Sequence, residues 1–187
     1  KVVVRVRGAG DSKEDRTRRR ALVQNIPIIV LINSGSASAS EIVASALMDH
    51  DAALVLGERS FGKATVQGIR PLGSVLVKLT TARYYAPDGY TVQVHGVKPD
   101  ITVSDEVDGT FPPRFREEDM WKHLPELEGR KSDPERDAWV TELQELVGDG
   151  TVAEKFIRTH KNDALKPDFM LIRAMQYFDA LKLKPRP

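Results

Sequence analysis

The chain has 187 residues, 41% of them hydrophobic, which is enough to bury a core in one sizeable domain or in one domain with an appendage. Its 28 basic and 27 acidic side chains give a net charge of +1, which excludes the broad positive field that nucleic acid or an anionic membrane surface would require. There is no cysteine, so disulfides, thiolate metal sites and cysteine nucleophiles are excluded.

The first 56 residues have the pattern of strands around one helix. Valines at positions 2, 3, 4 and 6 predict a strand, and residues 8–20 predict a polar, basic loop. The continuous apolar run at residues 28–32 is typical of a strand buried on both faces, and residues 53–56 predict a second one. Residues 41–48 between them have an apolar stripe at helical spacing. We therefore expect a β-α-β unit with a parallel strand pair.

After Gly57 the pattern changes to strands joined by turns. Residues 65–69, 74–80 and 82–85 alternate as hairpins do, and the sequence PDG at residues 87–89 predicts a turn. Residues 97–103 predict a further turn and a last short strand. The apolar run at residues 26–32 is too short to cross a bilayer, so we expect no integral membrane span.

From residue 111 onward the apolar spacing is helical. This predicts two regions, a core at residues 1–110 and a helical extension at residues 111–187. We expect the helices to pack on the core, on a second copy of the chain or on an adaptor protein. Their three apolar stripes are Trp139, Leu143, Leu146 and Val147; Val152, Phe156 and Ile157; and Phe169, Ile172, Met175, Tyr177 and Phe178.

Ser38 lies where the first buried strand gives way to the helix. Together with Glu41 it fits a capping box, in which a serine and a glutamate three residues later satisfy the helix N-terminus. The small residues around it would also let a substrate backbone approach a nucleophile, and the helix N-terminus supplies positive potential. Ser34, Ser36 and Ser40 compete for this role, so position alone selects no single serine.

Lys63 lies in an apolar and β-branched stretch just before the hairpin strands. A solvent-facing lysine on a strand is the ordinary interpretation, whereas a buried lysine amine can serve as a general base. In an extended chain Lys63, Thr65 and Gln67 share one face. Gln67 could therefore hold the amine by a hydrogen bond without adding negative charge.

The histidines offer a rival general base. None of the four has a recognisable orienting partner in the sequence, and no histidine pair or acidic cluster has metal-ligand spacing. We interpret all four as structural, and we expect neither a metal nor a cofactor. They are His50, His95, His123 and His160.

Four sequence blocks, taken together, resemble the catalytic core of the carboxyl-terminal processing proteases, also called tail-specific proteases. They are NSGSASASE at residues 33–41, GERSFGKATVQ at 57–67, TARYYAPDG at 81–89 and GVKPDITV at 96–103. The resemblance implies an α/β fold, namely the C-terminal part of a crotonase-like protease core with β-hairpins. It also implies a serine nucleophile, a lysine base and a glutamine that steadies the lysine. These roles fall on Ser38, Lys63 and Gln67.

The resemblance further implies a serine endopeptidase that cuts near the C-terminus of partly unfolded proteins with extended apolar tails. The backbone amide of Ala39 would stabilise the oxyanion, and the protein would work in the periplasm or cell envelope. The chain departs from the family pattern at Ala64, where a glycine is usual. It also lacks the family's upstream segment, which supplies the second oxyanion amide, and the PDZ domain that binds substrate tails.

Because of these departures we expect residues 1–187 alone to be weak or inactive as an enzyme, and a start at Lys1 indicates a fragment or a mature product. Two alternatives remain open. One is a catalytically incomplete peptide-binding or scaffold module, and the other is a crotonase-like enzyme that acts on acyl-CoA and has no need of Lys63.

Overall fold

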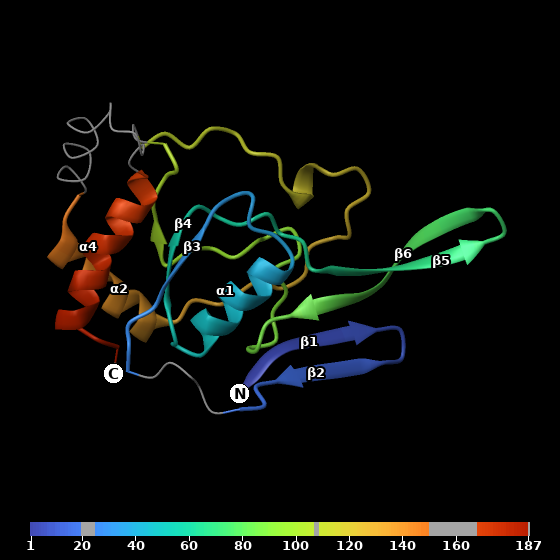
Figure 1. The fold of residues 1–187 in the computed structure, drawn as a ribbon, viewed down its shortest axis with the longest axis horizontal. Helices are drawn as coiled ribbons and strands as arrows, with labels where there is room; N and C mark the ends of the chain where they lie inside the picture. Colours follow the sequence, from blue (N-terminus) through green and yellow to red (C-terminus); the bar gives the residue numbers. More distant parts are fainter. Residues whose placement is uncertain (20–24, 107–108, 150–167, 187) are drawn as a thin grey trace.

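The computed structural model describes residues 1–19, 25–106, 109–149 and 168–186. Within these residues the chain forms a four-stranded sheet, a three-stranded sheet, three α-helices and one short 3-10 helix (Figure 1). The expected stripe of Val152, Phe156 and Ile157 lies outside the described residues, as do Arg20 and His160.

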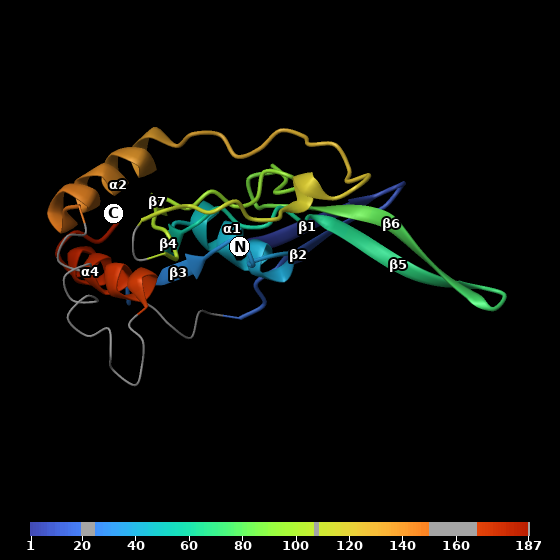
Figure 2. The ribbon, with the colours of Figure 1, turned by 90° about the horizontal axis from the view of Figure 1, so that it is seen from above.

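The four-stranded sheet is antiparallel, in the order β2-β1-β6-β5. Its strands are β1 (Val2–Gly8), β2 (Ser12–Arg16), β5 (Thr65–Leu72) and β6 (Val75–Tyr85). Strands β5 and β6 form a long hairpin that extends away from the rest of the molecule (Figure 2). Much of this hairpin is therefore exposed on both faces, including its apolar side chains.

Two sequence-based boundaries in this sheet were wrong. Residues 8–20 are not all loop, because β2 pairs with β1 there and Glu14 accepts a hydrogen bond from Arg5 at 2.8 Å. The strand was missed because β2 is an exposed, charged edge strand without apolar alternation. The expected break between residues 80 and 82 is also absent, since Thr81 is an extra residue opposite the step from Val66 to Gln67 and β6 continues through it.

The three-stranded sheet confirms the predicted β-α-β unit. Strand β3 (Ile29–Ile32) and β4 (Leu54–Gly57) are parallel, with α1 (Ala39–Asp49) between them in the chain, and β7 (Ile101–Thr102) pairs in parallel on the other side of β4. The prediction that β3 is buried on both faces was wrong for Leu31, which is exposed because β3 is an edge strand of this sheet.

Alternate residues of β4 face two different hydrophobic clusters. Val55 packs with Ala44 and Met48 of α1, whereas Leu54 and Leu56 belong to a cluster with the C-terminal helices. Because successive strand side chains point to opposite faces, α1 covers one face of this sheet and the C-terminal helices cover the other. The three-stranded sheet is therefore the middle of a three-layer arrangement (Figure 1).

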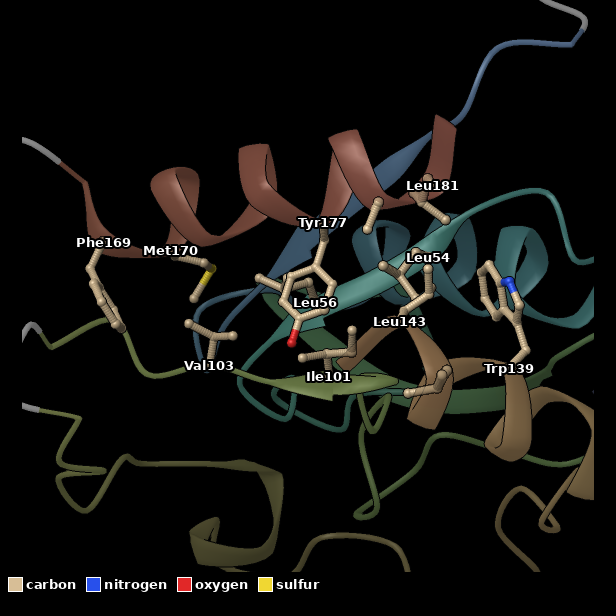
Figure 3. Packing of buried hydrophobic residues seen from close by; sticks show 12 residues of the cluster. Leu54, Leu56, Ile101, Val103, Trp139, Leu143, Phe169, Met170, Tyr177 and Leu181 are labelled. Atoms are coloured by element: carbon tan, nitrogen blue, oxygen red, sulfur yellow. The ribbon is translucent and has the colours of Figure 1, made fainter. Parts of the chain in front are cut away.

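The C-terminal helices α2 (Pro134–Val147) and α4 (Phe169–Leu183) begin at well-defined caps. The side chains of Asp133 and Asp168 accept hydrogen bonds from backbone amides of the first turns, and Pro134 opens α2. Figure 3 shows Tyr177 pointing from α4 toward Leu56 of β4. The expectation that these helices pack on the core is thus confirmed for α2 and α4.

Only part of each of the two described stripes is buried. The buried members from the two stripes are Trp139, Leu143, Phe169 and Tyr177. By contrast, Leu146 and Met175 are 56% and 62% exposed. Residues 111–133, which connect the core to α2, contain the short 3-10 helix η1 (Glu117–Asp119).

Arg136 fastens α2 to the β-α-β unit. Its guanidinium donates to both carboxylate oxygens of Asp100, each at 2.6 Å, and to the carbonyl oxygens of Met48 and Ala53. A further hydrogen bond of 2.9 Å reaches Asp51. The Arg136 side chain is 1% exposed and that of Asp100 is 5% exposed, so this ion pair is buried. A bidentate pair with every donor satisfied fixes the position of α2 as well as stabilising it.

We predict that Arg136→Met lowers the free energy of unfolding by about 3–5 kcal/mol, because it leaves the buried Asp100 carboxylate without its partner. Urea denaturation measures this loss. Lys131→Met is the matched control, since it removes a cation whose side chain is 83% exposed and should change stability by less than about 1 kcal/mol. A loss below 1 kcal/mol for Arg136→Met would contradict the anchoring role.

Candidate active site

Ser38 occupies the N-cap position of α1, after the turn that follows β3. Its backbone has φ 55° and ψ −107°, a conformation that residues other than glycine rarely adopt. The side chain is half-buried and makes no capping hydrogen bond to the helix. The hydroxyl therefore lies at the positive end of α1.

A tight turn precedes Ser38 and connects it to the lysine segment. The Ser36 hydroxyl accepts from the Asn33 amide at 3.2 Å, and Asn33 Oδ1 accepts from the Gly35 amide at 3.0 Å. The Phe61 amide donates to the Ser36 carbonyl at 2.9 Å. Ser36, one of the competing serines, thus has a structural role in this turn.

The Glu41 carboxylate joins the serine and lysine segments. Its Oε2 accepts from the backbone amides of Ser38 at 2.8 Å and Lys63 at 2.9 Å. Its Oε1 accepts from the Ser60 hydroxyl at 2.5 Å and the Gly62 amide at 2.7 Å. The glutamate is fully buried. Glu41 thus binds the Ser38 amide, as the predicted capping box requires.

Burial raises the pKa of Glu41, and the hydrogen bonds from Ser60, Gly62, Ser38 and Lys63 oppose that rise. An ionised carboxylate accepts at both oxygens, which is what four converging donors require. The fold therefore has a strong preference for glutamate at this position.

Lys63 lies in an irregular segment between β4 and β5, and its side chain is half-buried. The preceding Gly62 has φ 97°, and a Cβ there would lie 2.8 Å from the Val94 carbonyl oxygen. The following residue, Ala64, is buried, and its amide donates to Gln93 Oε1 at 2.9 Å. Glycine is thus required before the lysine, and a small side chain fits after it.

Gln67 lies on β5 just where the hairpin leaves the body of the molecule. The extra residue opposite this point is on β6, so β5 keeps its alternation and Thr65 and Gln67 share a face. Thr65 is buried, whereas Gln67 is exposed. Within the described residues, no hydrogen bond joins the side chains of Ser38, Lys63 and Gln67.

Ala39 is the first residue of α1, directly after Ser38. Backbone amides in the first turn of a helix have no partner within the helix, and they point toward the positive end of its dipole. An anion forming beside Ser38 would meet this end of α1.

The described histidines each bind a backbone carbonyl through a ring nitrogen. His50 contacts the Val2 oxygen at 2.6 Å, His95 the Leu127 oxygen at 2.7 Å and His123 the Leu124 oxygen at 3.0 Å. Each of the three rings is thus engaged with a backbone carbonyl. In the described part of the chain, no three His, Asp or Glu side chains gather as a metal ion would require.

Sequence reasoning named Glu41 only as a capping residue and missed its bonds to Ser60, Gly62 and Lys63. Its place three residues after Ser38 was the available signal. Gln93, which is fully buried and binds the Ala64 amide, was missed altogether. No local pattern marks it, because its partners lie far away in the sequence.

Residues 1–103 match Peptidase family S41. The match covers more than half of the chain. The chain belongs to peptidase family S41. This family of serine peptidases is the one that the four sequence blocks resemble, so that prediction is confirmed.

Individual S41 relatives agree with this assignment. A carboxy-terminal-processing protease of Bartonella bacilliformis is 49% identical over 109 residues, which are 58% of this chain and 24% of that protein. The solved structure of a photosystem II D1 C-terminal processing protease is 34% identical with a TM-score of 0.53, over 57% of this chain and 28% of that one. The matched S41 segment is therefore about a quarter of these relatives' length.

The same S41 structure supports the mixed α/β fold. Residues after 103 lie beyond the family match, although they pack against it. Among the described residues, no helix combines the length and the apolar character needed to cross a membrane.

We predict that Glu41→Gln lowers the free energy of unfolding by at least about 2 kcal/mol. The amide keeps one acceptor oxygen but turns an NH2 group toward two of the buried donors, which are then left without acceptors. Chemical denaturation measures the loss. Glu145→Gln, on the exposed side of α2, is the control and should have little effect. Equal stabilities of the two variants would count against the central role of Glu41.

Proposed function

We propose that this chain is the C-terminal part of a crotonase-like serine protease core, which cleaves near the C-terminus of partly unfolded proteins through a Ser38–Lys63 dyad. The observation that carries the proposal is the shared carboxylate of Glu41, which holds the amides of Ser38 and Lys63 within 2.9 Å of one oxygen. Two segments that are 25 positions apart in the sequence thereby meet at the N-terminus of α1.

In this mechanism the Ser38 hydroxyl attacks the scissile carbonyl while the neutral Lys63 amine accepts the hydroxyl proton. The amide of Ala39 stabilises the negative oxygen of the tetrahedral intermediate, aided by the dipole of α1. Protonated Lys63 then returns the proton to the leaving amine, and water releases the acyl group by the same route. Gln67 orients the Lys63 amine, and no metal or cofactor takes part.

We propose this peptidase activity for the full-length protein and not for residues 1–187 alone. The family resemblance assigns the second oxyanion amide to a segment upstream of the serine, and loss of one such donor costs roughly 10²–10³ in rate. We therefore propose that residues 1–187 alone are weak or inactive. The division into residues 1–110 and 111–187 remains our proposal for the functional units.

Extended apolar tails are the proposed substrates, and the β5–β6 hairpin supports this choice. It begins two residues after Lys63 and carries Ile69 and Leu76 at 62% and 73% exposed. Ile69 lies on the same face as Gln67, with Leu76 opposite Pro71 on that face too. An extended substrate leaving the active site along this face would cover these side chains.

Assembly and location are further parts of the proposal. Leu171, Met175 and Phe178 fall on one stripe of α4, and the first two are at least 50% exposed, which supports a contact with a second copy or an adaptor protein. Sedimentation equilibrium of the purified protein tests self-association. A periplasmic or cell-envelope location follows from the family resemblance, and cell fractionation tests it.

One observation keeps a peptide-binding or scaffold module as the second candidate. In the described residues the Ser38, Lys63 and Gln67 side chains share no hydrogen bond. Catalytic hydrogen bonds are often long before substrate binds, so this geometry suits both candidates. Peptide cleavage separates them.

We predict that Ser38→Ala in the full-length protein lowers peptide turnover by roughly 10⁴-fold or more, and that Lys63→Ala is nearly as damaging because the two residues act as a unit. Gln67→Ala should have a smaller effect. The stability of Ser38→Ala should change by only about 1 kcal/mol, because the loss of a capping hydroxyl costs about that much.

Mass spectrometry of cleaved peptides, with thermal melts as the control for folding, measures these effects. Undiminished cleavage by either Ser38→Ala or Lys63→Ala would refute the dyad. A wild-type protein that binds peptides without cutting them would establish the scaffold alternative.

For substrate binding we predict that Ile69→Ser raises KM for a peptide with an apolar tail by about tenfold, the effect of losing one buried aliphatic side chain. Leu79→Ser is the matched control. Leu79 is 52% exposed but pairs with Gly68, on the other face of the hairpin. Equal changes in KM for the two variants would show that the Gln67 face has no special role.

A further inference from the structure

A short stretch of the C-terminal extension contacts the segment that carries Lys63. The Glu117 amide, in η1, donates to the Phe61 carbonyl at 3.1 Å. The Arg116 guanidinium donates to the carbonyl of Ser60 at 2.8 Å and also to that of Arg59. The Phe115 ring lies 6.4 Å from the Phe61 ring. Residues 115–117 lie outside the family match, which ends at residue 103.

Gln93 completes this contact through its side chain. Its Oε1 accepts from the Ala64 amide at 2.9 Å, and its Nε2 donates to Glu117 Oε1, also at 2.9 Å. Gln93 is fully buried and Glu117 is 4% exposed. The hydrogen bonds thus form a closed path from Phe61 through Glu117 and Gln93 to Ala64.

The chemistry of this path allows one arrangement. The Ala64 amide can only donate, so the oxygen of the Gln93 amide must face it, and the NH2 group must then face Glu117. The residue at position 117 must consequently offer an acceptor. The other oxygen, Glu117 Oε2, is buried and has no hydrogen-bond partner among the described residues.

Hydrogen bonds to Glu41 and to the Gln93–Glu117 pair therefore hold the four consecutive residues 61–64. Glu41 binds the amides of Gly62 and Lys63, and the Gln93–Glu117 pair binds the Ala64 amide while Glu117 also binds the Phe61 carbonyl. We infer that Glu117, acting through Gln93, is a positioning residue for Lys63, so that the C-terminal extension forms part of the active site. This inference rests on the proposed function of Lys63 as the base.

The expected effects follow from how strongly the reaction rate depends on the position of the catalytic base. A misplacement of about 1 Å can cost 10²-fold in rate. Glu117→Ala should thus lower kcat by about 10- to 100-fold with little change in KM. Glu117→Gln should restore most of kcat, because its amide oxygen can still accept from Gln93.

The experiment uses the full-length protein with Glu117→Ala, Glu117→Gln and the matched control Glu118→Ala. Glu118 is the neighbour in η1, and its ion pair with Arg59 is exposed, so its loss should leave turnover unchanged. Two readouts are taken: kcat and KM for an apolar-tailed peptide, and hydrogen exchange of the amides at residues 62–64. Exchange at Ala64 should be roughly tenfold faster in Glu117→Ala than in wild type.

The outcomes separate this inference from the proposed function. Faster exchange and lower kcat in Glu117→Ala, with recovery in Glu117→Gln, support positioning. Wild-type kcat and exchange in a folded Glu117→Ala overturn it, as does a loss that Glu117→Gln does not repair. A wild-type protein that cleaves no peptide refutes the proposed function, and amide exchange then decides alone whether Glu117 holds the segment.

Discussion

The buried carboxylate of Glu41 is the interaction on which the candidate site depends. It lies in the first turn of α1, yet three of its four hydrogen bonds go to the segment after β4. Burying a carboxylate is costly unless its oxygens are satisfied, and here every donor comes from a fixed backbone position or from the buried Ser60. The serine segment and the lysine segment therefore cannot move apart without exposing unpaired polar groups.

The C-terminal extension is joined to the S41 segment by packing as well as by hydrogen bonds. Leu54 and Leu56 of β4 share a hydrophobic cluster with Leu143 and Tyr177 of the C-terminal helices. Arg136 joins the same layers through Asp100, in the last family block. The family match ends at residue 103, but the hydrophobic core does not. The catalytic candidates thus lie in a structure whose stability depends on residues from both regions.

The sequence was most informative where local pattern and burial agree. The β-α-β unit followed from two apolar runs around an amphipathic stripe, and the hairpin followed from alternation after Gly57. The charged strand β2 was not predicted, because an edge strand exposed to solvent needs no apolar face and so shows no apolar alternation. Residues such as Gln93 and Glu117 could not have been found, since a polar residue buried by distant partners has no local signature. The roles of Ser38, Lys63 and Gln67 stay predictions that cleavage measurements decide.

The backbone of Ser38 has a consequence for how this protein can evolve. A positive φ at a residue with a side chain costs of order 1–3 kcal/mol, and glycine adopts it freely. Mutation of Ser38 to glycine would therefore relieve the backbone strain and stabilise the folded state. Its only cost would be the lost hydroxyl. In a lineage that no longer needs the chemistry, drift should remove this serine early. If the hydroxyl is the nucleophile, as we propose, selection for the reaction would oppose that drift.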